Sequence, residues 1–148
     1  MILAHKIQFK KLTKDQEVFF EKSAGTARYT WNWALAKWIE NYEKGIKTNA
    51  LDLKKEWNKI KPDWVYDSPK DCNQQPFTNL ATAFKRFFNK VSAYPNFKSK
   101  HDGKDSFYIS NDKFKLDNKK VKLPLIGWLK LTEELRFDGK IVSATISK

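Results

Sequence analysis

The chain has 148 residues, enough for one domain or two small ones that bury a core without a disulfide or a structural metal. Its 41% hydrophobic and 31% charged residues are typical of a folded globular protein and exclude a disordered chain. Lys and Arg number 29 against 17 Asp and Glu, and this net charge of +12 predicts a polyanionic partner, with nucleic acid ahead of an anionic membrane surface.

The residue types also exclude several kinds of site. No apolar stretch approaches the roughly 20 residues that cross a bilayer, and the N-terminus lacks the pattern of a signal peptide. Cys72 is the only cysteine and the only histidines are His5 and His101, so we expect no disulfide, metal or cofactor. A protein of the reducing cytoplasm, not bound to membrane, is the resulting expectation.

Lysine supplies nearly all the positive charge, because the only arginines are Arg28, Arg86 and Arg136. A lysine ammonium is a point charge that suits phosphate, whereas bidentate recognition of guanine favours arginine. The composition therefore predicts contact with a nucleic-acid backbone and little reading of bases by arginine.

Hydrophobic periodicity predicts a strand followed by four helices in the first two thirds of the chain. Residues 2–10 alternate as a half-buried strand, and the capping-box pattern at 13–16 begins a helix that we expect to end at Gly25. Thr26 would cap a second helix running to Gly45, and the two helices could form a helix-turn-helix.

The third helix is expected from Thr48 or Asn49 to Ile60, and Pro62 closes it. A fourth helix follows, either from near Asn73 or after a tightened turn before Pro76, and runs to about Val91.

The last third of the chain has a different pattern, in which short apolar runs alternate with turn signals. The expected strands are 106–110, 113–116, 121–123, 127–131 and 140–146. Pairing of the first strand with these late strands predicts an α+β fold: a small β-barrel of residues 1–10 and 96–148, interrupted by a helical bundle of residues 11–95.

Four collinear segments resemble the OrfB/TnpB-type proteins of bacterial and archaeal insertion sequences. They are Thr13–Gln16 with Gly25–Leu35, Gln74-Gln75 with Leu80 and Ala83–Phe88, Tyr94–Lys100 with Ser106-Phe107, and Val121–Pro124 with Ile126–Trp128. The resemblance implies an OB-like wedge barrel and a helical recognition domain of an RNA-guided DNA endonuclease. In such proteins these parts hold a guide RNA and read a short DNA motif beside the target, while base pairing reads the rest.

The family also has a RuvC-like nuclease domain and a four-cysteine zinc ribbon, for which this sequence has no counterpart. Cleavage of a phosphodiester by two metal ions needs clustered carboxylates, and the acidic residues here are dispersed among lysines. We therefore expect a chain that binds nucleic acid without cutting it and that has no catalytic residue.

Two pairs of polar residues are candidates for contact with bases. Gln74 and Gln75 begin the fourth helix, where the resemblance implies reading of the flanking motif; amides can pair with adenine, but they also cap helices. Ser110 and Asn111 match the family's second motif-reading segment, although Asn111 followed by Asp112 equally suits a turn.

The remaining candidates are basic and would contact phosphates. The fourth helix and the loop after it carry a run that predicts a backbone track, consisting of Lys85, Arg86, Lys90, Lys98, Lys100 and Lys104. Lys70 precedes the same helix, and Arg28 could bind phosphate or pair with an acid such as Glu21 or Asp15.

These observations favour a binding module that contacts DNA and a guide RNA, with its oligomeric state undetermined. Two alternatives remain open. One is a helix-turn-helix transposase domain or repressor that binds DNA without RNA, and the other is a protein-interaction module that regulates a full-length relative.

Overall fold

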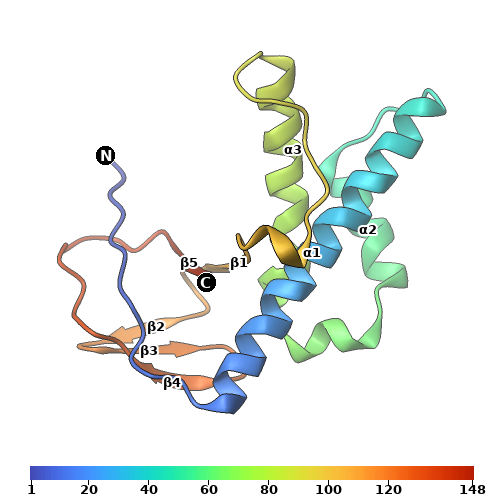
Figure 1. The fold of residues 1–148 in the computed structure, drawn as a ribbon. Helices are drawn as coiled ribbons and strands as arrows, with labels where there is room; N and C mark the ends of the chain where they lie inside the picture. Colours follow the sequence, from blue (N-terminus) through green and yellow to red (C-terminus); the bar gives the residue numbers. More distant parts are fainter.

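The computed structural model describes all residues from 1 to 148, and its helices and strands gather in separate parts of the molecule (Figure 1). This mixed arrangement confirms the expected α+β class. The helices are α1 (Lys14–Glu43), α2 (Ala50–Ile60) and α3 (Gln75–Phe88), with short 3₁₀ helices at Asp63–Asp67, Lys70–Asn73 and Lys100–Asp102. The strands are β1 (Ser106–Ser110), β2 (Lys115–Asp117), β3 (Lys120–Leu123), β4 (Gly127–Lys130) and β5 (Ser143–Ser147).

Helix α1 begins at the predicted capping box but does not stop where we expected. The backbone N–H of Gln16 donates to the Thr13 hydroxyl, and the Gln16 amide oxygen accepts from the Thr13 N–H. The expected break at Gly25 is wrong, because the helix runs without interruption from Lys14 to Glu43, a length of 30 residues. Thr26, expected as the cap of a second helix, donates its hydroxyl to the Lys22 carbonyl instead. Residues 13–45 are therefore not two helices joined by a turn.

The other two helices begin largely as expected. The Asn49 side chain caps α2 by accepting from the backbone N–H of Asp52, at 2.9 Å. Helix α3 starts at Gln75, directly after the 3₁₀ helix Lys70–Asn73, which is the tightened turn predicted before Pro76. Pro76 is tolerated in the first turn because backbone N–H groups there have no partner within the helix.

The strands form two sheets rather than the closed OB-like barrel that we expected. Strands β1 and β5 form an antiparallel pair, and β2, β3 and β4 form a separate antiparallel sheet. The first strand, expected over residues 2–10, is reduced to a bridge between Phe9 and Leu131, with the Lys10 N–H donating to the Lys130 carbonyl at 2.9 Å. The last strand starts at Ser143, three residues later than expected.

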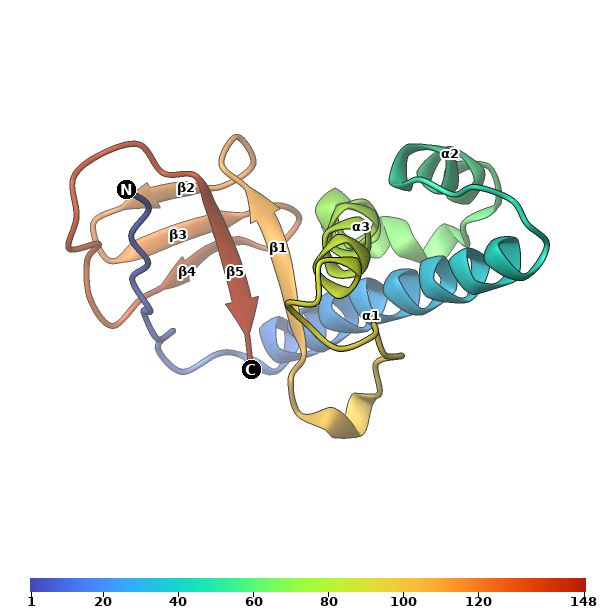
Figure 2. The ribbon, with the colours of Figure 1, turned by 90° about the horizontal axis from the view of Figure 1, so that it is seen from above.

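Two hydrophobic clusters stabilise the molecule, and α1 contributes to both of them. Figure 2 shows α1 extending from the sheets to the other helices. Its Ala24 packs in the cluster between the two sheets, whereas Trp31, Ala34 and Leu35 pack against α2 and α3. Burial of both faces outweighs the roughly 1 kcal/mol that a glycine costs inside a helix, which explains why Gly25 does not break α1.

None of the helices has the length and apolar character needed to cross a membrane.

Candidate nucleic-acid interface

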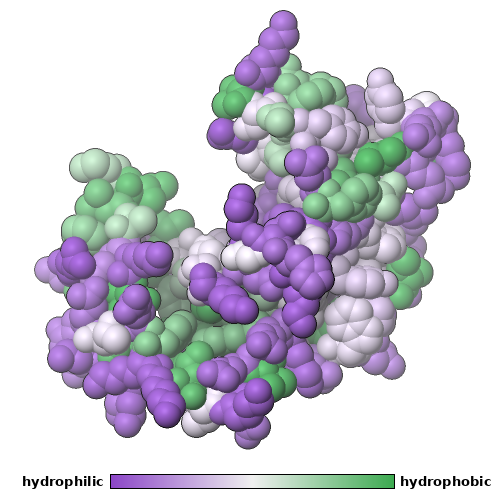
Figure 3. Space-filling view, viewed as in Figure 1, coloured by the Kyte–Doolittle hydropathy of each residue, from purple (hydrophilic) through white to green (hydrophobic).

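A cleft of about 190 Å³ lies where the helices meet the β1–β5 sheet. It is lined by α1, the start of α3, the loop before β1, and both strands of the sheet, through residues that include Arg28, Trp31, Gln75, Asn79, Lys98 and Lys104. Figure 3 shows the molecule hollowed between its two parts, with hydrophilic side chains gathered along this face.

The charged side chains of the cleft that have no ion-pair partner are positive. Its two carboxylates already have basic partners, because Asp105 pairs with Arg28 at 2.7 Å and Asp71 pairs with Lys113 at 3.0 Å. Lys98 and Lys104 line the same cleft and make no ion pair. The cleft therefore favours an anionic ligand.

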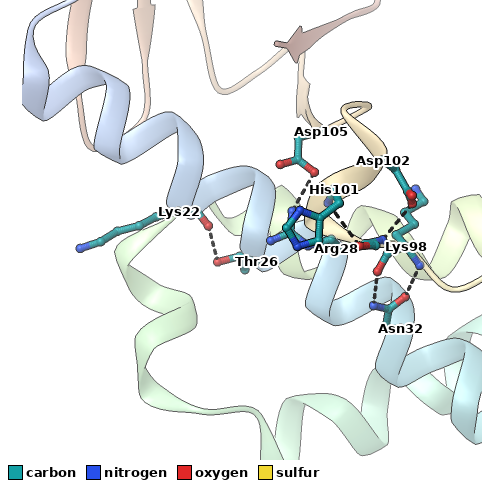
Figure 4. A network of polar contacts seen from close by, with 9 residues as sticks. Lys22, Thr26, Arg28, Asn32, Lys98, His101, Asp102 and Asp105 are labelled. Atoms are coloured by element: carbon teal, nitrogen blue, oxygen red, sulfur yellow. Dashed lines mark hydrogen bonds and ion pairs between the residues drawn. The ribbon is translucent and has the colours of Figure 1, made fainter.

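Side chains of α1 fix the loop that carries these lysines (Figure 4). Asn32 donates from its amide to the Lys98 carbonyl and accepts from the Lys98 backbone N–H, both at 2.8 Å. The indole N–H of Trp31 donates to the Asn96 carbonyl at 2.8 Å. Arg28 pairs with Asp105, not with Glu21 or Asp15, so it holds the loop rather than presenting a free guanidinium.

The Lys98 ammonium lies over the Trp31 ring, 4.2 Å from its centroid. Desolvation at this position lowers the pKa of Lys98 from its ordinary value. The sequence pattern placed Lys98 in a basic run but gave no sign of the tryptophan beneath it, which lies 67 positions earlier in the chain.

The two candidate glutamines have different environments. Gln74 is only 7% exposed, and its amide donates to the Asn58 side chain at 2.8 Å and to the Asn73 carbonyl at 3.0 Å. Gln75 lines the cleft and donates to Asn79 at 3.2 Å. Of the two, Gln75 is thus the one available to a ligand, and Asn79 beside it was not predicted although its i+4 spacing pointed to the same helix face.

Ser110 links β1 to the segment that precedes α3. The buried Asp71 carboxylate accepts from both the backbone N–H and the hydroxyl of Ser110, at 2.9 Å each. Burial alone would raise the pKa of Asp71, but these bonds and the Lys113 ammonium outweigh it and leave the pKa below its ordinary value. Asn111 is exposed in the turn after β1. The contact of Asp71 with Ser110 was not predicted, because it joins positions 39 residues apart in the chain.

Substitution Asp71→Asn is expected to lower the free energy of unfolding by about 1–3 kcal/mol at pH 7, since it removes the charge from a buried, multiply bonded acceptor. A group whose pKa is depressed by folding stabilises the protein above its unfolded pKa and loses that contribution as the pH falls through the folded value. The difference between the two proteins should therefore shrink below about pH 4.

Urea denaturation at pH 7 and at pH 3 measures this difference. Asp138→Asn, an exposed acid without a hydrogen-bond or ion-pair partner, serves as the control and should change little at either pH. An equal loss for Asp71→Asn at both pH values would contradict the role of its charge.

The remaining basic candidates are exposed and free of acidic partners. Lys70 begins the 3₁₀ helix before α3, and Lys100 begins the one before β1. Lys85, Arg86 and Lys90 lie at the far end of α3 from the cleft, and Arg86 donates to the Ser92 hydroxyl at 3.0 Å.

A polar stripe along α3 connects the cleft with this basic end. At 3.6 residues per turn, Gln75, Asn79, Thr82 and Arg86 fall on one face of the helix. The face runs from an amide pair at the cleft to a guanidinium about 17 Å further along the axis. This is the length and character of a surface that can follow a nucleic-acid groove or backbone.

Residues that could supply metal or thiol chemistry do not converge. No group of three or more His, Cys, Asp or Glu side chains is placed to hold a metal ion. Burial raises the pKa of the Cys72 thiol to about 12, and the neighbouring Asp71 adds to the shift. The thiol therefore remains protonated at neutral pH.

Comparison with known proteins relates the chain to a family model and to a longer protein. Residues 1–47 match a family model described as a helix-turn-helix domain, HTH_OrfB_IS605. Over 138 residues, which are 90% of the chain, the sequence is 30% identical to the Escherichia coli K12 protein named "Putative RNA-guided DNA endonuclease InsQ". The chain spans 34% of the length of InsQ. Within the 47 matched residues the structure has the single helix α1, which continues to Glu43 without a turn.

Proposed function

We propose that this chain, which is related to the N-terminal portion of OrfB/TnpB-type insertion-sequence proteins, is a module that binds a guide RNA and the DNA flanking its target. The observation that carries the proposal is the positive cleft beside the start of α3, where the ligand-accessible Gln75 and the unpaired Lys98 and Lys104 meet. The relation to InsQ covers 90% of the chain, so the segments that form the cleft lie within the similar region or close to it.

We assign the contacts by what each side chain is free to do. Gln75 and Asn79 form hydrogen bonds with base edges. Phosphate or sugar near the cleft is contacted by Lys70, Lys98, Lys100 and Asn111. Arg28, Gln74 and Ser110 act indirectly, since their hydrogen bonds inside the protein position the loop, α3 and β1. Lys85, Arg86 and Lys90 extend the backbone contact along α3.

We further propose that residues 1–10 and 96–148 correspond to a wedge-like unit and residues 11–95 to a helical recognition-type insertion. The two hydrophobic clusters support this division. Helix α1 belongs to both clusters, so the two units would be held in a fixed relation, and the cleft between them would be preformed.

Triple charge reversal at Lys85, Arg86 and Lys90 to Glu tests the extended contact. Loss of three phosphate contacts should weaken binding to RNA and to duplex DNA of any sequence and reduce the salt slope by about three units. Fluorescence anisotropy with labelled RNA and DNA measures both quantities. The matched control reverses three lysines on or near α2, Lys47, Lys55 and Lys59, and carries the same net charge. An equal effect of the two triple variants would refute the assignment.

The chain is expected to bind nucleic acid and leave it intact in the presence of Mg²⁺ or Mn²⁺. Two-metal cleavage needs carboxylates that hold cations about 3.5–4 Å apart, and the surroundings of the cleft repel cations. Gel analysis of labelled RNA and DNA after incubation with a nuclease-free preparation measures cleavage. Metal-dependent cutting that an acid-to-amide substitution in this chain abolishes would contradict this expectation.

A further inference from the structure

The outer face of the β2–β3–β4 sheet has a composition unlike that of an ordinary solvent-exposed sheet. Its inward side chains, Val121, Leu123 and Leu129, are buried in the core between the sheets. The alternation of side chains therefore turns the rest of these strands outward, and the outward set contains Lys115, Asp117, Lys120, Lys122, Trp128 and Lys130.

The strand register arranges this face in two rows. Lys115 lies opposite Lys122, which lies opposite Trp128. In the second row Asp117 lies opposite Lys120, which lies opposite Lys130. Lys10 extends this row beyond β4, because its backbone N–H donates to the Lys130 carbonyl.

Three pairs of directly opposite residues therefore carry like charge: Lys115 with Lys122, Lys120 with Lys130, and Lys130 with Lys10. Directly opposite side chains have Cβ atoms about 4.5–5.5 Å apart, and like charges at that spacing destabilise a sheet. None of these lysines makes an ion pair, and Asp117 is the one acid among them. The like-charge pairs therefore do not stabilise the free protein, whereas a polyanion would relieve their repulsion.

A hollow beside the second row reinforces this interpretation. It is lined by Lys10, Lys119, Lys120 and Lys130, against the acids Asp117 and Glu134. It shares no residue with the cleft at α3, so it is a separate surface.

Trp128 specifies the kind of polyanion. Its side chain is 46% exposed on the open face of the sheet, beside Lys122, and makes no aromatic contact within the protein. An exposed indole flanked by lysines can stack on a base while the ammonium groups meet the adjacent phosphates. A base within a duplex has both faces covered, so the ligand must be unpaired, and unpaired bases are the usual target of recognition in RNA.

We propose that the outer face of the β2–β3–β4 sheet binds an unpaired segment of RNA, with a base stacked on Trp128 and phosphates held by the lysine rows. This inference rests on the proposed function as a nucleic-acid-binding module. It places this unpaired segment on a surface separate from the cleft and from α3, which the proposed function assigns to other contacts with base edges and phosphates.

The test uses the intact chain and a fluorescein-labelled twelve-nucleotide oligouridine, which has no secondary structure, in anisotropy titrations at low salt. Trp128→Ala should weaken binding by about 5- to 150-fold, the range for loss of one base–aromatic stack, and Trp128→Phe should restore most of it. Trp64→Ala is the matched control, because Trp64 is also exposed, at 44%, but lies in the 3₁₀ helix Asp63–Asp67. Circular dichroism melts check that each variant remains folded.

Charge reversal tests the lysine rows in the same assay. Lys120→Glu with Lys130→Glu should weaken oligouridine binding far more than Lys55→Glu with Lys59→Glu, which changes the net charge equally on α2. Equal affinities of Trp128→Ala and Trp64→Ala would overturn the proposal. So would tighter binding of an RNA duplex, or of the matching oligothymidine, with the same dependence on Trp128.

The outcomes separate this proposal from the one on which it rests. If duplex DNA binding depends on the α3 surface while Trp128→Ala has no effect on RNA, the sheet site is wrong and the proposed function stands. If the intact chain binds neither RNA nor DNA, both are wrong.

Discussion

Raising the salt concentration from 50 to 200 mM is expected to weaken binding of this chain to duplex DNA by about 10³- to 10⁵-fold, for six to ten phosphate contacts. The reason is that lysines supply most of the positive charge of this chain that has no partner within the protein. Of the three arginines, Arg28 is paired with Asp105, Arg136 is 3.5 Å from Glu133, and Arg86 donates to Ser92. Affinity must therefore come largely from ammonium–phosphate contacts, which release counterions and respond steeply to salt.

Anisotropy titrations at four or more salt concentrations give the slope of log K against log salt. A value between about −5 and −9 is expected for B-form DNA, and a smaller slope for a single strand with the same number of contacts. The control variant with Lys47, Lys55 and Lys59 reversed should keep nearly the same slope. A flat response would exclude lysine–phosphate contact as the source of affinity.

Substitution Trp57→Ala is expected to lower the free energy of unfolding by about 3–5 kcal/mol. Trp57 is 1% exposed and packs against the rings of Tyr29, Trp33 and Phe77, which belong to α1 and α3. Trp57 therefore links α2 to both other helices, together with the buried Leu53 of the same helix. A loss of this size is a large share of the 5–15 kcal/mol that stabilises a typical domain.

Urea denaturation followed by circular dichroism measures this loss. Leu51→Ala on the same helix is the control, because Leu51 is 60% exposed and should change stability by less than about 0.5 kcal/mol. If both substitutions cost the same, the helices are not packed around Trp57 as described.

Short-range features of the fold were predictable from the sequence because their causes are local. The capping box at 13–16, the approximate span of α2 and the span of β1 all follow from hydrogen bonds or periodicity within a few residues. The break at Gly25 was wrong because the low helix propensity of one glycine is smaller than the burial of the helix on either side of it. The closed barrel was wrong because closure depends on pairings between distant segments, and the first segment supplies only the bridge at Phe9.

The candidate site was predictable in its charge and in the segments that form it, but not in its side-chain contacts. A basic run says nothing about which lysine lies over Trp31, and a Gln-Gln pair does not reveal that Gln74 turns inward to Asn58 while Gln75 lines the cleft. The contacts of Asn32 with Lys98 join positions 66 residues apart. The collinear segments that resemble the OrfB/TnpB-type proteins did identify Gly25–Leu35 and Tyr94–Lys100, and these two segments meet in the structure.

The continuous helix α1 also bears on the alternative of a repressor that binds DNA without RNA. That alternative rested on two helices joined by a turn near Gly25, and residues 14–43 have no such turn. The surface that remains suited to a DNA groove is the polar stripe of α3, which begins at the cleft that we propose binds nucleic acid.

The most direct test of binding through the cleft is a titration of a labelled DNA duplex and a labelled RNA stem-loop with the intact chain at 50 mM salt, repeated with Lys100→Glu and Lys104→Glu combined. We expect saturable binding of both probes by the intact chain, a loss of at least about tenfold in the double variant, and little loss in the control with Lys55→Glu and Lys59→Glu. Binding that is equally strong in the double variant would place the interface elsewhere. Failure of the intact chain to bind either probe would contradict a nucleic-acid-binding function and favour a role in binding another protein.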